Sequence, residues 1–74
     1  MNRSQALAPL KKGEARMPIE AGALVRGHIR RALLTLMLDF YEEKGWFEST
    51  FIVRGDIDRV MAFRKYLKNL EDFG

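Results

Sequence analysis

Few side chains in this 74-residue sequence could take part in chemistry. His28 is the only histidine, and no carboxylate, hydroxyl or second histidine stands three or four residues away from it. Neither an acid–base pair nor a histidine metal pair is therefore encoded on its helix face. Cysteine is absent, which excludes disulfides and thiolate metal sites. The hydroxyl residues lie in no nucleophile-elbow or phosphate-loop context, and the glycines have no phosphate-binding spacing.

Asp39, Glu42 and Glu43 form a small cluster of carboxylates. Asp39 and Glu43 are four residues apart, and two copies of the cluster could in principle hold a hard cation. A solvated acidic turn balanced by Lys44 is the simpler interpretation. We therefore expect a protein that is not an enzyme and that has no catalytic residues, no cofactor and no metal.

The basic side chains are concentrated in the first part of the chain. Residues 1–31 contain seven basic and two acidic residues, a net charge of +5, whereas residues 32–74 have a net charge of −2. A basic leading segment is typical of proteins that contact polyanions such as nucleic acid or an anionic membrane surface. The candidate polyanion-binding residues are Lys11, Lys12, Arg16, Arg26, Arg30 and Arg31. Helix-turn-helix spacing and zinc ligands are missing, so no known nucleic-acid module supports this prediction.

Hydrophobic spacing predicts the elements that position these residues. Residues 1–17 show no sustained period and contain helix-breaking residues, which indicates a flexible basic arm. Residues 18–74 are expected to form a single small α+β domain, because so short a chain cannot divide its core. A long helix is predicted over 19–44, where apolar residues recur at spacings of three and four. Its apolar positions are Val25, Ile29, Leu33, Leu36 and Phe40, with a second stripe of Leu34, Leu38 and Tyr41.

Two further elements follow in the second half of the chain. Phe47, Phe51 and Val53 alternate with polar residues, which predicts a strand over 46–54. Asp56 is suited to cap a helix, and an amphipathic pattern extends from there, so a second helix is predicted over 56–71. The expected order is therefore arm, helix, strand and helix.

A single strand cannot satisfy its own backbone donors and acceptors. We therefore expect strand pairing to be completed across a homodimer, which would also bury the helix that is apolar on two sides. In a trial register, Phe51 lies on the two-fold axis and Glu48 faces the second copy of Arg54. The predicted dimer interface consists of Leu34, Leu38, Tyr41, Trp46, Phe47, Glu48, Phe51, Val53 and Arg54.

The sequence thus predicts a small, non-enzymatic, homo-oligomeric binding protein. An alternative is a nucleic-acid-binding regulator that uses the basic arm with Arg26, Arg30 and Arg31 on phosphates. A third hypothesis is an accessory subunit that docks on a larger host protein through an exposed apolar patch. No apolar stretch is long enough to span a membrane and no targeting signal is evident, so the expected location is cytoplasmic.

Overall fold

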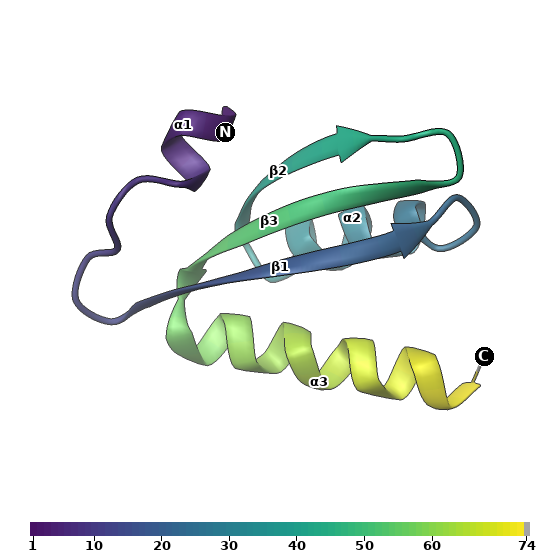
Figure 1. Ribbon diagram of the computed structural model, residues 1–74. Coiled ribbons are helices and arrows are strands. Elements are labelled where there is room, and N and C mark those ends of the chain that lie inside the picture. The colour runs from purple at the N-terminus through teal and green to yellow at the C-terminus, as the bar shows by residue number, and fades with distance from the viewer. Residues whose placement is uncertain (74) are drawn as a thin grey trace.

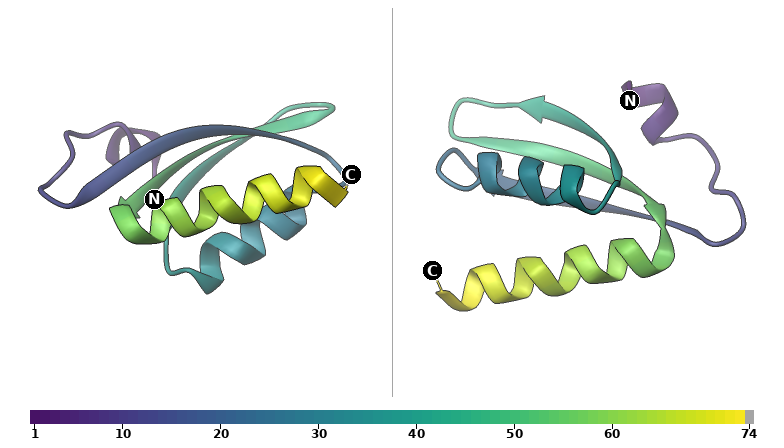
Figure 2. Two further views of the ribbon diagram at one scale, coloured as in Figure 1. Left: turned by 90° about the horizontal axis from the view of Figure 1, so that it is seen from below. Right: turned by 180° about the vertical axis from the view of Figure 1, so that it is seen from behind.

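A computed structural model describes the backbone of residues 1–73 and the side chains of residues 1–70 (Figure 1). The elements are α1 (Arg3–Ala6), β1 (Glu14–Gly22), α2 (Arg26–Thr35), β2 (Asp39–Lys44), β3 (Glu48–Asp56) and α3 (Ile57–Phe73). The strands form one antiparallel sheet in the order β1-β3-β2. The outer strands β1 and β2 thus run parallel to each other with β3 inserted between them, which is a split βαβ arrangement. Helices α2 and α3 cover one face, and the N-terminal segment lies over the other (Figure 2).

The prediction of one strand completed across a homodimer is wrong. β3 pairs within its own chain on both sides, so that Phe51 lies opposite Ile19 of β1 and opposite Glu42 of β2. Glu48 lies opposite Gly22, not opposite a residue of a second chain. The physical argument for a homodimer was the unpaired strand, and that argument no longer holds.

β1 was missed because its residues were assigned to the flexible arm and to the start of the long helix. Its alternating apolar residues, Ala15, Met17, Ile19 and Ala21, share the face that packs against the helices. Pro18 is tolerated because of the register of the β1–β3 ladder. The N–H of Ile57 donates to the carbonyl of Gly13, and that of Ala23 donates to the carbonyl of Phe47, so the backbone N–H and C=O groups of the odd-numbered residues of β1 point towards β3. The missing N–H of Pro18 therefore faces the free edge of the sheet, where no ladder bond is lost.

The predicted helix over 19–44 is interrupted by a helix stop that contains no glycine. The N–H of Leu38 donates to the carbonyl of Leu33 at 2.9 Å, and that of Met37 donates to Leu34 at 3.1 Å. Together these bonds form a Schellman motif, and Met37 occupies its left-handed position with φ of 56°. The chain therefore leaves α2 and enters β2, although the apolar spacing continues without a break.

The core lies between the sheet and its two helices, and both later elements contribute to it. The predicted strand and second helix correspond to β3 and α3, and the Asp56 side chain accepts a hydrogen bond from the N–H of Asp58, as expected of a cap. The buried apolar residues of this core are Ile19, Ala21, Ile29, Leu33, Leu38, Phe51, Val53, Val60 and Phe63. Within the described residues, no helix is both long and apolar enough to cross a membrane.

Candidate functional site

The residues predicted to form a dimer interface are separated by the fold. Leu38, Phe51, Val53 and Arg54 are buried in their own chain, Tyr41 is half-buried, and Leu34, Trp46, Phe47 and Glu48 are exposed. The buried ones already have their contacts within the chain. Of the aromatic residues in the set, Trp46 and Phe47 remain available for a partner.

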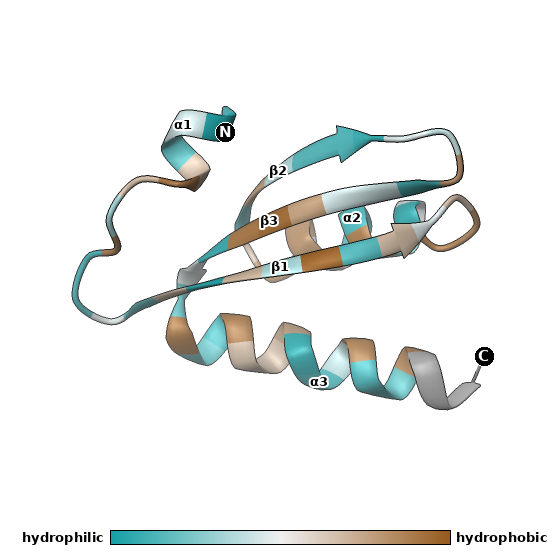
Figure 3. Ribbon diagram, in the orientation of Figure 1, coloured by the Kyte–Doolittle hydropathy of each residue, from teal (hydrophilic) through white to brown (hydrophobic). Residues whose placement is uncertain are grey.

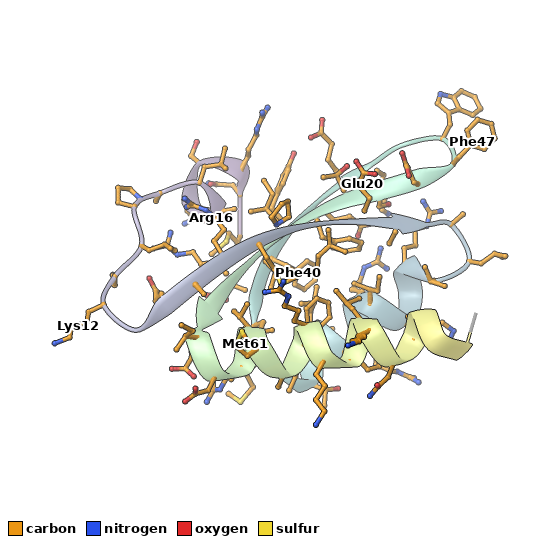
Figure 4. The ribbon with its side chains drawn as sticks, turned by 60° about the horizontal axis from the view of Figure 1, so that its bottom comes forward. Lys12, Arg16, Glu20, Phe40, Phe47 and Met61 are labelled. Atoms are coloured by element: carbon orange, nitrogen blue, oxygen red, sulfur yellow. The ribbon has the colours of Figure 1, made fainter. Side chains whose placement is uncertain are left out.

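Three large apolar side chains protrude from one end of the molecule, and we call them the apolar tip. Leu24 on the β1–α2 loop is 93% exposed, and Trp46 and Phe47 on the β2–β3 turn are 95% and 86% exposed. The two loops lie side by side, because the N–H of Ala23 donates to the carbonyl of Phe47 at 3.0 Å. Both loops carry hydrophobic residues in Figure 3, and Phe47 extends away from the sheet in Figure 4.

The turn that carries Trp46 and Phe47 is tight. The N–H of Gly45 donates to the carbonyl of Glu48 at 2.8 Å. A Cβ atom at position 45 would lie 2.6 Å from that same carbonyl oxygen, so only glycine fits without a shift of the backbone. Turn chemistry favours glycine, asparagine and aspartate at central positions, so it does not account for two aromatic residues there.

The predicted polyanion-binding residues do not form one surface. The guanidinium of Arg16 donates to the carbonyls of Ala6 and Ala8, at 3.2 and 2.7 Å, on the face of the sheet opposite the helices. Arg30 forms an ion pair with Glu42, with Nη2 at 2.6 Å from Oε1. Both arginines are thus engaged within the chain.

The two lysines of the set lie far from the arginines of α2. Lys11 and Lys12 precede β1, whereas α2 begins after β1 has crossed the sheet, so Arg26 lies at the other end of the molecule. Figure 4 shows Lys12 and Phe47 at opposite ends. Only Arg26 and Arg31 remain together on α2 without an ion pair among the described residues.

The carboxylate cluster is also divided by the fold. Because side chains alternate along β2, Asp39 and Glu43 lie on one face of the sheet and Glu42 lies on the other. Among the residues that the structure describes, no group of three or more histidines and carboxylates is placed to hold a metal ion.

Glu42 and Ser49 are polar groups on the helix side of the sheet. The side chain of Glu42 is 9% exposed, and Ser49 is fully buried. Burial raises the pKa of Glu42, but the hydrogen bond from Arg30 lowers it, and the net shift is downward. The Ser49 hydroxyl lowers this pKa as well. Among the described residues, neither Ser49 Oγ nor Glu42 Oε2 has a hydrogen-bond partner of good geometry. The ion pair joins α2 to β2, with the Glu42 side chain covered and the Arg30 side chain 39% exposed.

A groove separates the two helices on their outer surface. It has a volume of about 380 Å³ and is lined by His28, Arg31, Ala32, Thr35, Leu36, Ala62 and Tyr66. Both helices contact the sheet and not chiefly each other, which leaves this space between them. A second hollow near the start of α2 shares His28 and Arg31 with the groove.

Sequence reasoning missed Leu24 of the tip and, apart from Arg31, the residues that line the groove on both helices. Leu24 was placed inside the long predicted helix, although Gly22 just before it ends an alternating apolar pattern. The groove depends on how α2 and α3 are spaced on the sheet, and no local pattern encodes that spacing. Comparison with protein-family models, with curated proteins and with solved structures gives no match for this chain.

Proposed function

We propose that this small α+β protein is a non-enzymatic interaction protein that binds a partner protein through the apolar tip. The observation that carries the proposal is the exposure of Leu24, Trp46 and Phe47, which is 86% or more for each side chain. Tryptophan is enriched among the residues that dominate binding energy at protein interfaces. The hydrogen bond between the loops and the tight turn preorganise these side chains, which reduces the entropy lost on binding.

Binding energetics indicate what the partner must provide. Full burial of a large apolar side chain contributes roughly 1.5–3 kcal/mol, so the three side chains together contribute on the order of 5–9 kcal/mol. Association costs about 4–15 kcal/mol in lost translational and rotational freedom. The tip therefore serves as an anchor for a preformed apolar pocket, and stable binding requires further contacts around it.

Nucleic-acid binding is the competing function, and the fold reduces its support. Arg16 and Arg30 are engaged within the chain, and the lysines of the arm lie at the far end from Arg26. A contact with mixed DNA or RNA would depend on phosphates and would weaken steeply with salt.

Site-specific crosslinking in extracts of expressing cells tests the proposal. A photoreactive phenylalanine analogue replaces Phe47 in one protein and the exposed Met37, on a different loop, in a matched control. We expect adducts from position 47 that are absent from position 37 and that are lost when Trp46 and Leu24 are changed to serine. An adduct of twice the chain mass identifies a second copy as the partner. Equal adducts at both positions, or none at position 47, would refute the proposal.

Binding of labelled duplex DNA and RNA at about 50 mM salt is measured on the same proteins. Tight binding that the Trp46→Ser change leaves intact would favour the competing function. Circular dichroism of each variant establishes that the fold is retained.

A further inference from the structure

The groove between α2 and α3 has an apolar floor and contains no residue of the apolar tip, although Leu24 lines the adjoining hollow. Ala32 and Leu36 of α2 and Ala62 and Tyr66 of α3 supply its apolar lining. The distance from His28 to Leu36 along α2 is eight residues, or about 12 Å at 1.5 Å per residue. This length matches two turns of a third helix.

Cationic side chains lie on both helices that form the groove. Arg31 lines the groove from α2. Lys65 of α3 stands three residues after Ala62 and lines a neighbouring hollow on the same helix. Among the described residues that line the groove, none carries a carboxylate. Helices α2 and α3 together contain seven arginines and lysines and three acidic residues, and of these cations only Arg30 has an ion pair in the described part of the chain. Charge complementarity therefore selects an anionic occupant.

The apolar floor of the groove favours one class of anionic ligand over others. Phosphates of a nucleic acid would gain nothing from an apolar floor, because their contacts are made by cations and backbone donors. Alanine at positions 32 and 62 leaves room for another backbone to approach closely. Apolar side chains at spacings of three and four on a helix would enter such a groove, as in other helix-in-groove complexes.

We propose that the groove between α2 and α3 binds an acidic amphipathic helix of another protein. The apolar stripe of that helix lies on Ala32 and Ala62, and its flanking carboxylates pair with Arg31 and Lys65. This proposal does not depend on the function of the apolar tip, so either proposal can be refuted without affecting the other.

A designed probe tests the chemistry of the occupant. The probe is a fluorescent, stapled helical peptide of about 15 residues, with leucines on one face and glutamates on both flanks. One control peptide carries lysine in place of glutamate, and a second carries serine in place of leucine. Fluorescence anisotropy is expected to show binding of the first peptide alone, with a dissociation constant well below about 1 mM.

Matched variants place the peptide in the groove. Ala62→Glu puts a carboxylate into the groove, whereas Met61→Glu makes the same change at the adjacent exposed residue, which does not line it. Arg31→Glu reverses a bordering charge, and Arg64→Glu reverses one outside the lining. We expect affinity losses of about tenfold for Ala62→Glu and about fivefold for Arg31→Glu, and changes within about twofold for both controls.

Each alternative occupant has a distinct outcome that would overturn the proposal. Equal losses for Arg31→Glu and Arg64→Glu would indicate nonspecific attraction. Dodecanoate that binds in an Ala62-dependent manner while the acidic peptide does not would indicate a small amphipathic anion instead. Displacement of the peptide by duplex DNA at physiological salt would indicate a nucleic-acid surface. The Trp46→Ser variant is expected to bind the peptide like the unmodified protein, which separates this test from that of the tip.

Discussion

Arg54 fastens the N-terminal segment to the sheet, and we predict that Arg54→Met destabilises the fold. Its guanidinium is almost buried and donates to the carbonyls of Gln5, Ala8 and Pro9 at 2.8, 3.1 and 2.7 Å. It also forms an ion pair with Glu14 at 3.0 Å. Methionine would fill a similar apolar volume but leave all four contacts unmade.

The loss of stability caused by Arg54→Met is limited by the free energy with which the N-terminal segment docks on the sheet. Each hydrogen bond to a charged group contributes roughly 1.5–3 kcal/mol, so four would contribute on the order of 6–12 kcal/mol if every acceptor stayed buried. The acceptors instead return to water once the segment detaches. Arg16 lies directly opposite Arg54 in the ladder and shares the carbonyl of Ala8 with it, so the change also removes a like-charge contact. We therefore expect a loss of about 2–4 kcal/mol in the free energy of unfolding.

A double-mutant cycle with a chain that lacks residues 1–10 measures this coupling. Only Ala6 of that segment is buried, so the remaining core is intact after the deletion. Urea denaturation followed by circular dichroism gives the free energy of unfolding of all four proteins. We expect Arg54→Met to cost less than about 1 kcal/mol in the shortened chain, and the coupling energy to be about 1.5–3 kcal/mol. Additive effects within about 0.5 kcal/mol would refute the reasoning.

Three further predictions concern the helix stop, the Arg30–Glu42 ion pair and the free edge of β1. Met37→Gly is expected to raise the free energy of unfolding by about 0.5–1 kcal/mol in urea denaturation, because glycine adopts the left-handed conformation without strain and the exposed side chain packs on little. Because the pKa of Glu42 is lowered in the folded state, its contribution to stability is present above the unfolded pKa of about 4.3 and is lost as the pH falls through the folded value. Glu42→Gln weakens the pair with Arg30 and should therefore lower the free energy of unfolding at pH 7. It should also reduce the loss of that free energy between pH 5 and pH 3, and an unchanged loss would contradict a lowered pKa of Glu42. Pro18→Val restores a donor on the free edge of β1 and is expected to promote self-association in sedimentation, whereas a variant that sediments like the unmodified protein would show that the proline does not protect this edge.

The second half of the fold could be predicted because its local signals agree with its tertiary role. Phe51 and Val53 alternate with polar residues and face the core, and Asp56 caps the helix that follows. The predicted strand and helix lie within two residues of β3 and α3 at each end. In this region no competing pattern was present.

The first half could not be predicted from local patterns, for two physical reasons. Pro18 argued against a strand, although it is harmless where its nitrogen faces the free edge, and the edge is known only once the sheet is assembled. The Schellman motif at Met37 was hidden because a non-glycine residue accepts the left-handed conformation there, at some cost in strain. The apolar spacing through Phe40 fits a helix as well as it fits a helix followed by a strand, so the predicted long helix included the residues of both α2 and β2. The dimer argument followed from that error.

The arginines illustrate why the candidate binding surfaces could be identified only with the structure. A sequence counts arginines but does not show which of them are already satisfied. Arg16 and Arg54 bind carbonyls of the N-terminal segment, and Arg30 is held by Glu42, so these three contribute to the fold. Arg31 has no ion pair among the described residues and borders an apolar groove. A cation that is free of internal partners and lies beside an apolar floor has the most to gain from an anionic amphipathic ligand, which is why the helix layer, and not the basic leading segment, is where we expect such a ligand to bind.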